Sequence, residues 1–124
     1  MNIVFVDSCI VIDYTKKVQR VISAIDMIDQ PCFNFIVEME LLQGARNKRD
    51  LVAIQQQLES FSLLNCPPEV ESLSTNLIAT FNLSHNLTIG DAVIAATCLT
   101  YDIPLWTYNL KDFRFIPGIE LFKC

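Results

Sequence analysis

The stretch Ile3-Val4-Phe5-Val6-Asp7 decides the fold class. An unbroken run of four apolar residues is typical of a strand that is buried on both faces, as in the parallel sheets of α/β proteins. Asp7 follows this run directly, so it stands at the carboxyl end of the predicted strand. Because ligands bind beyond the carboxyl ends of the strands in such sheets, Asp7 is a candidate functional residue.

Beyond this strand, short apolar runs alternate with longer stretches of helical periodicity. Further strands are predicted at 33–36, 63–64, 105–107 and 119–122. Helices are predicted at 8–16, 18–28, 38–45, 48–61, 69–83 and 89–100. Strands that alternate with helices form βαβ units, so we expect an α/β fold. The predicted architecture is a three-layer α/β/α sandwich with a mostly parallel central sheet, formed by residues 1–124 as one domain.

The composition excludes several classes of protein. Hydrophobic residues make up 52% of the chain and charged residues 19%, against about 45–50% and about 25% in ordinary domains. This apolar content argues against disorder, and three scattered glycines without heptads argue against collagen-like or coiled-coil chains. The low charge predicts that a partner or a second subunit covers part of the surface. A net charge of −5 argues against non-specific coating of nucleic acid, but bound metal ions would invert the field around an acidic centre.

The five cysteines form no Cys-x-x-Cys pair and are odd in number, which argues against a zinc site. We interpret them as free thiols in a reducing cytoplasm. A nucleophilic pair of Cys9 with His85, the only histidine, has no local signature. The N-terminus lacks the basic region of a signal peptide, and no apolar run approaches the ~18 residues of a membrane span. We therefore expect a cytoplasmic protein without membrane attachment.

The predicted fold directs four separated carboxylates to one edge of the sheet. They follow the first strand, lie in the opening turns of the helix after the second strand and of the helix before the fourth strand, and follow the fourth strand: Asp7, Glu40, Asp91 and Asp112. Asn109 lies in the same loop as Asp112 and is an alternative to it. A plain loop role explains either of these two residues equally well.

The other three carboxylates also have structural interpretations. Asp7 is a favoured N-cap for the helix that begins at residue 8, and Glu40 lies near the positive end of its helix. Asp91 has the spacing of a capping box with Thr88. The stretch from Ala92 to Ala96 is nearly all apolar, however, and a carboxylate that opens a deeply buried helix needs a partner or a metal ion.

Carboxylates that converge at one edge repel one another and raise one another's pKa unless a cation lies among them. A set of hard oxygen ligands suits Mg²⁺ or Mn²⁺, and Mg²⁺ keeps several waters and binds phosphate oxygens. Such a site implies hydrolysis of a phosphodiester. The basic clusters Lys16-Lys17-Arg20 and Arg46-Lys48-Arg49 are either solvated surface or contacts to RNA phosphates beside this centre.

With these residues in view, the chain resembles PIN-domain ribonucleases, in particular the VapC-type toxins of bacterial toxin–antitoxin pairs. Beside Asp7, the motifs that carry the resemblance are Glu40-Leu41-Leu42-Gln43-Gly44, Gly90-Asp91-Ala92-Val93-Ile94-Ala95-Ala96, Leu105-Trp106-Thr107-Tyr108-Asn109-Leu110-Lys111-Asp112-Phe113 and Ile116-Pro117-Gly118-Ile119. The resemblance implies an α/β/α sandwich and a Mg²⁺-dependent endoribonuclease, with Mn²⁺ as an alternative ion. It also implies an RNA substrate, a homodimer, and a cognate antitoxin protein whose C-terminal segment covers the site.

The resemblance assigns roles to the candidate residues. Asp7 and Asp91 would be the main metal ligands, and Glu40 would bind the metal through water or orient the attacking water. The fourth catalytic position would be Asn109 or Asp112. The metal would lower the pKa of the water and stabilise the charge that develops on the phosphate. The products would carry a 5′-phosphate and a 3′-hydroxyl, without a covalent intermediate.

Two positions depart from the family pattern. Cys9 stands where an Asn or Ser usually follows the first Asp, and Val37 stands where a Ser or Thr usually precedes the Glu. Both changes are expected to remove hydrogen bonds, and losses of this kind reduce activity or metal affinity by about 10–100-fold. The alternative function is therefore a weak or inactive PIN-like domain that binds RNA or protein. A phosphoacceptor domain is disfavoured, because the third strand ends at Leu64-Asn65-Cys66 without an acceptor Asp.

Overall fold

Strand β1 (Ile3–Val6) lies inside a four-stranded parallel sheet in the computed structural model, which describes residues 1–124. The sheet has the order β3-β2-β1-β4, and its other strands are β2 (Gln30–Phe33), β3 (Ser62–Leu63) and β4 (Leu105–Trp106). Val4, Phe5 and Val6 are at most 1% exposed. The prediction of a strand buried on both faces is therefore confirmed.

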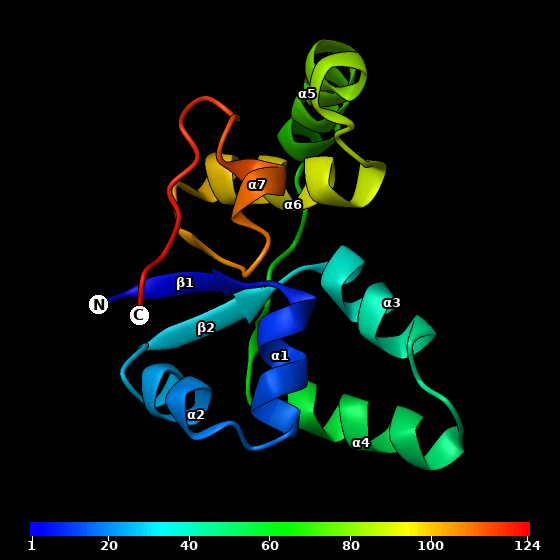
Figure 1. Cartoon of the computed structure of the whole chain (residues 1–124), viewed down its shortest axis with the longest axis vertical. Helices are drawn as coiled ribbons and strands as arrows, with labels where there is room; N and C mark the ends of the chain where they lie inside the picture. Colours follow the sequence, from blue (N-terminus) through cyan, green and yellow to red (C-terminus); the bar gives the residue numbers. More distant parts are fainter.

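Helices cover both sides of this sheet (Figure 1). One side carries α1 (Ser8–Thr15), α2 (Gln19–Asp26), α3 (Phe35–Gln43) and α4 (Lys48–Leu58). The other side carries α5 (Pro68–His85), α6 (Ile89–Tyr101) and α7 (Leu110–Phe113). The predicted three-layer α/β/α sandwich is confirmed, and all three strand pairings in the sheet are parallel.

The strand order creates a switch point between β1 and β4. The chain passes from β1 to β2 and β3 on one side, and returns after α5 and α6 to β4 on the other side of β1. Because Val6 pairs with Trp106, the carboxyl ends of β1 and β4 lie side by side. Open parallel sheets bind ligands at such a point. This order also differs from the flavodoxin-like order, in which the third strand lies beside the first.

Helix α6 is buried along most of its length, as predicted. Three alanines, Ala92, Ala95 and Ala96, are fully buried together with Ile94. Side chains this small let α6 pack closely on its neighbours, and its most extensive helix contact is with α5. Asp91 therefore lies in the first turn of a helix that packs closely on its neighbours.

The second strand and the helix after it begin earlier than predicted. The strand ends at Phe33 and does not run over 33–36, and α3 starts at Phe35 and not at residue 38. The reason is Asn34, whose side-chain oxygen accepts a hydrogen bond of 3.3 Å from the backbone N–H of Val37. This N-cap turns an apolar segment that reads as a strand into the first turn of a helix.

The C-terminal segment also differs from the prediction. The fifth strand at 119–122 is reduced to a single parallel bridge between Leu105 and Leu121. Gly118, at φ +82°, turns the chain just before this segment. The predicted loop after β4 contains the short helix α7, and β3 lies one residue before its predicted place at 63–64. None of the helices has the length and apolar composition that a membrane crossing requires.

Leu105→Ala should lower the free energy of unfolding by about 2–5 kcal/mol, because it opens a cavity beside the buried central strand. The side chain of Leu105 is 0% exposed. Urea denaturation followed by circular dichroism measures the change. Leu83→Ala is the matched control, since Leu83 is 97% exposed on α5, and it should change stability by no more than about 0.5 kcal/mol. Equal effects of the two substitutions would contradict this packing.

Candidate active site at the carboxyl edge of the sheet

Asp7 is the only charged residue in the buried interior, with 4% of its surface exposed. Its carboxylate accepts two hydrogen bonds of 2.8 Å, from the backbone N–H of Ser8 and from the hydroxyl of Thr107. The first bond makes Asp7 the N-cap of α1, so the structural interpretation holds. Burial raises the pKa of Asp7, and both hydrogen bonds act against this rise. The N-cap position thus holds a carboxylate that water hardly reaches.

Thr107 is a site residue that the sequence reasoning missed. It is 4% exposed and lies directly after β4, in the same position that Asp7 has after β1. Its hydroxyl group donates a hydrogen bond to Asp7, and the hydroxyl oxygen accepts one of 3.0 Å from the backbone N–H of Asn109. The signal that would have found it is this position: a polar residue directly after the second strand at the switch point.

Cys9 keeps part of the hydrogen bonding that its departure from the family pattern was expected to remove. Its sulfur lies 3.8 Å from the hydroxyl oxygen of Thr107. Because the hydroxyl hydrogen of Thr107 is donated to Asp7, the Cys9 thiol is the donor in this contact. Burial raises the pKa of the Cys9 thiol, which keeps it protonated and able to donate. Val37, by contrast, is 0% exposed and adds only an apolar side chain.

Glu40 and Asp91 reach the same edge from α3 and α6. The Glu40 carboxylate lies against the N-terminus of α6, where a Cβ on Gly90 would stand 3.5 Å from Oε2. The hydroxyl of Thr88 accepts a hydrogen bond of 3.2 Å from the backbone N–H of Asp91, so Thr88 is the N-cap of α6. Glu38, two residues before Glu40, shows no comparable contact with this edge.

The raised pKa values of Asp7, Glu40 and Asp91 each have neighbouring carboxylates among their causes. Burial, followed by the charges of Asp7, Asp112 and Glu40, raises the pKa of Asp91 to about 6. Burial and then the charge of Asp7 also raise the pKa of Glu40. Asp112 contributes to the raised pKa of Asp7 as well. Side chains from four segments of the chain therefore share one region of negative potential.

The two candidates for the fourth position lie differently in the structure. The charge of Asp112 acts on the pKa of both Asp7 and Asp91. Asn109 is exposed and stands at the N-cap of α7 without a side-chain capping bond, and its contact with the site is made by its backbone N–H. The loop that carries both residues is tied to α1, because the Tyr108 hydroxyl donates a hydrogen bond of 2.7 Å to Asp13.

The donor set fits a hard divalent cation, although the side chains are not yet arranged around one. No group of three or more His, Cys, Asp or Glu side chains forms a ready metal-binding cluster. Mg²⁺ commonly takes only one or two carboxylates and keeps several waters. A cation at this edge would relieve the repulsion that raises the pKa of Asp91.

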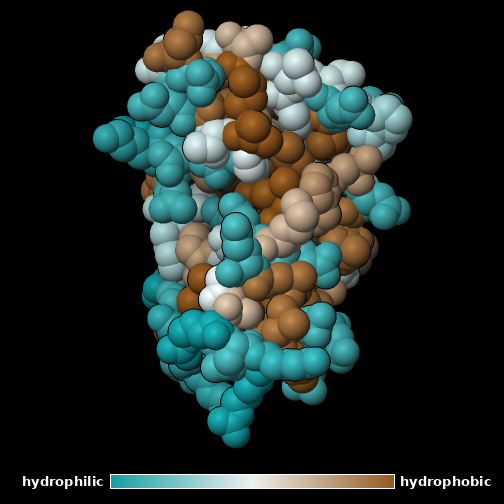
Figure 2. Space-filling model, turned by 90° about the vertical axis from the view of Figure 1, so that its right-hand side faces the viewer, coloured by the Kyte–Doolittle hydropathy of each residue, from teal (hydrophilic) through white to brown (hydrophobic).

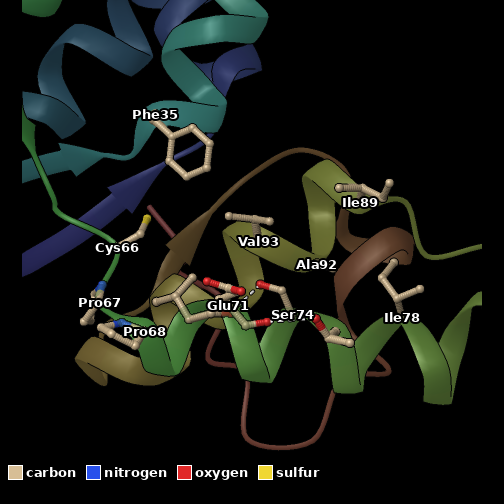
Figure 3. A pocket seen from close by; sticks show the side chains of 12 residues that line it. Phe35, Cys66, Pro67, Pro68, Glu71, Ser74, Ile78, Ile89, Ala92 and Val93 are labelled. Atoms are coloured by element: carbon tan, nitrogen blue, oxygen red, sulfur yellow. Dashed lines mark hydrogen bonds between the residues drawn. The ribbon is translucent and has the colours of Figure 1, made fainter.

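A separate apolar groove lies on the face formed by α3, α5 and α6. Hydrophobic side chains gather there in a band between more hydrophilic regions (Figure 2). The groove has a volume of about 650 Å³, and Phe35, Ile78, Ile89 and Val93 line it (Figure 3). None of the four acidic residues lines this groove. A smaller cavity of about 290 Å³, between α1, α3 and α4, does include Glu40.

The carboxyl of Asp91 should titrate near pH 6 in the metal-free protein, measured by ¹³C NMR of the side-chain carboxyl carbon. Asp7→Asn removes one of the negative charges that raise the pKa of Asp91, so it should shift this titration to lower pH. Asp26→Asn, on the exposed surface of α2, is the control and should leave it unchanged. If Asp7→Asn left the pKa of Asp91 unchanged, the two carboxylates would not lie close together.

Asp91→Asn should raise the melting temperature at pH 7 and leave it nearly unchanged below pH 4. The pKa of Asp91 is raised from 3.8 to about 6 by folding, so the folded chain binds more protons than the unfolded chain between these values. The contribution of this group to stability is therefore complete at acid pH and lost as the pH rises through about 6. Thermal melts at both pH values measure the effect. Glu120→Gln, at an exposed position outside the helices and the four-stranded sheet, is the control.

Comparison with known proteins agrees with this fold. The PIN domain family model matches residues 4–117. A protein named Ribonuclease VapC from Rickettsia bellii (strain RML369-C) is 37% identical over 102 residues, 75% of each chain. A toxin–antitoxin complex from Klebsiella pneumoniae contains a chain with a TM-score of 0.76 and 26% identity, over 94% of both chains. A DNA-bound VapBC structure from Salmonella typhimurium has the same fold, with a TM-score of 0.86 at 20% identity over 98% of both chains. Because the family model spans nearly the whole sequence, this chain belongs to the PIN domain family, as its resemblance to VapC-type proteins predicted.

Proposed function

We propose that this chain is a cytoplasmic, metal-dependent endoribonuclease toxin of a type II toxin–antitoxin pair. The observation that carries the proposal is the buried carboxylate of Asp7 at the switch point, within electrostatic reach of Asp91, Glu40 and Asp112. The Rickettsia bellii relative is named a ribonuclease, and the Klebsiella pneumoniae structure is described as a toxin–antitoxin complex. Both names agree with hydrolysis of RNA under the control of a protein partner.

Asp7 and Asp91 would hold Mg²⁺, or Mn²⁺ in its place, and Glu40 would contact the ion through water. When bound, the ion lowers the pKa of a water molecule and stabilises the charge that develops on the scissile phosphate. Thr107 keeps the Asp7 carboxylate oriented and favours its ionised form through the 2.8 Å hydrogen bond.

Glu40 would take the proton of the attacking water. Its carboxylate stands on α3 beside the N-terminus of α6 and remains open to solvent. Its pKa is raised by burial and by the charge of Asp7, which makes its carboxylate a stronger base. Asp112 or Asn109 would complete the site, and the electrostatic reach of Asp112 favours Asp112.

The cavity beside Glu40 supports RNA as the substrate. Lys16 and Arg46 line it together with Glu40, one from each of the two small basic clusters in the sequence, and Arg46 forms an exposed ion pair of 3.0 Å with Asp50 there. Basic side chains that flank an acidic centre would hold the phosphates on either side of the one that is cleaved. The acidic net charge of the chain is then no obstacle, because the contacts to RNA are local.

The exposed apolar surface supports the protein partners that we propose: a second copy of the chain and a cognate antitoxin. Phe35 is 42% exposed, Met39 52% and Ile89 74%, on the face formed by α3, α5 and α6. Neighbouring large apolar side chains on a soluble domain mark an interaction site. The low charged content of the sequence agrees with such a covered face.

The alternative is a weak or inactive PIN-like domain that binds RNA or protein. Val37 is the observation in its favour, because a buried valine supplies no hydroxyl near the start of α3. Cys9 supports it less, since its thiol still contacts Thr107.

Purified protein should cleave structured RNA in the presence of Mg²⁺ or Mn²⁺, and EDTA should stop the reaction. Asp91→Asn should reduce the rate of cleavage by more than about 100-fold, because it removes a proposed metal ligand. Loss of a hydrogen bond that only orients such a ligand typically costs about 10–100-fold. Asp102→Asn is the matched control, with the same substitution at the exposed end of α6, and it should cleave like the native protein. Equal background cleavage by the native and Asp91→Asn proteins would favour the alternative function.

A further inference from the structure

A buried hydrogen bond joins the two helices that carry Glu40 and Asp91. The side-chain amide of Asn34 donates to the hydroxyl oxygen of Thr97 over 2.9 Å, and both residues are 0% exposed. Asn34 lies six residues before Glu40, at the N-cap of α3, and Thr97 lies six residues after Asp91 in α6. Each end of the bond is therefore attached to one of the proposed ligand helices.

The other hydrogen bonds of these two residues fix which of them donates and which accepts. The Thr97 hydroxyl donates to the backbone carbonyl of Val93 over 2.7 Å, so its oxygen accepts from Asn34. The side-chain oxygen of Asn34 accepts from the backbone N–H of Val37, which leaves its amide nitrogen to reach Thr97. Loss of the Thr97 hydroxyl would leave the buried side-chain amide of Asn34 without an acceptor, and an unpaired buried donor lowers the stability of the fold.

The distance along each helix is short between this hydrogen bond and the acidic edge, which is the carboxyl edge of the sheet that carries Asp7, Glu40, Asp91 and Asp112. Six residues of helix span about 9 Å, so a tilt of α3 by about 10° around Asn34 would move Glu40 by roughly 1.5 Å. Misplacement of a catalytic group by about 1 Å can cost about 100-fold in rate. The Glu40 carboxylate lies against Gly90, the residue before Asp91, so a small tilt of α3 changes this approach directly.

We propose that Asn34 and Thr97 are positioning residues that set the separation of Glu40 from Asp91, and through it the affinity of the acidic edge for a divalent cation. This inference rests on the proposed function. It gives a reason for a polar pair that lies fully buried between the two helices: the hydrogen bond gives α3 one defined orientation against α6, which close-packed apolar surfaces specify less sharply.

The test measures binding of Mn²⁺ alone to the full chain by isothermal titration calorimetry. Thr97→Val keeps the volume of the side chain and removes the hydroxyl, and it should weaken Mn²⁺ binding by about 10-fold. Thr97→Ser restores the hydroxyl and should restore the affinity. Asn34→Ser keeps a good N-cap for α3 but removes the amide donor, so it should weaken binding as Thr97→Val does.

Ser74→Ala is the matched control. The Ser74 hydroxyl is also buried and also donates to the carbonyl four residues earlier, that of Val70, over 2.6 Å. It lies in α5, and its bond stays within that helix. Ser74→Ala therefore reproduces the local loss in Thr97→Val without breaking a link between α3 and α6, and it should bind Mn²⁺ like the native chain.

RNA cleavage gives the second readout. Thr97→Val and Asn34→Ser should lower kcat and raise the Mg²⁺ concentration needed for half-maximal rate, with KM for RNA unchanged. Native Mn²⁺ affinity in folded Thr97→Val and Asn34→Ser proteins, with a native protein that binds the ion and cleaves RNA, would overturn this inference and leave the proposed function intact. A native chain that neither binds Mn²⁺ nor cleaves RNA would overturn both.

Discussion

The burial of the Asp7 carboxylate is the constraint on which the rest of the structure depends. A charged group that water hardly reaches must find hydrogen-bond donors within the protein. One donor is the backbone N–H of Ser8 at the start of α1, of the kind that a helix offers to its N-cap, and the other is the hydroxyl of Thr107, 100 residues away in the sequence. Thr107 reaches Asp7 only if β4 lies beside β1 and runs parallel to it. Strand order and the buried charge therefore support each other.

The sequence predicts the fold well where burial alone determines the local structure. The apolar run of β1 and the alanine-rich stretch of α6 are unambiguous, because nearly all of their residues are buried. The prediction is wrong at Phe35-Ile36-Val37, where apolar and β-branched residues indicate a strand but form the first turn of α3. A single side chain, that of Asn34, decides this boundary by capping the helix. Whether Asn34 caps a helix depends on where the backbone turns, and hydrophobic periodicity does not predict the place of that turn.

The candidate residues of the site follow from the same topology, and their functional roles stay predictions. Position after a strand or at the start of a helix was enough to select Asp7, Glu40 and Asp91, because parallel topology brings those ends to one edge. Thr107 was not selected, because it carries no charge and its contact with Asp7 arises from the pairing of two strands that are distant in the sequence. The joint coordination of one ion by three carboxylates stays a prediction. Ligation depends on side-chain rotamers that adjust to the ion, whereas what the structure shows is convergence at electrostatic range.

The raised pKa values of the carboxylates at this edge show how the candidate site affects the stability of the fold. Burial and mutual repulsion disfavour the charged forms of Asp7, Glu40 and Asp91, so the cation-free site opposes the stability of the fold near neutral pH. Sites that do chemistry commonly carry such a cost, because the groups are arranged for a ligand and not for the empty protein. A divalent cation would remove the repulsion, so binding of the ion and stability of the fold should rise together. The buried Asn34–Thr97 pair fits this account: carboxylates that repel one another would push α3 away from α6, and a committed hydrogen bond between the two helices resists that separation.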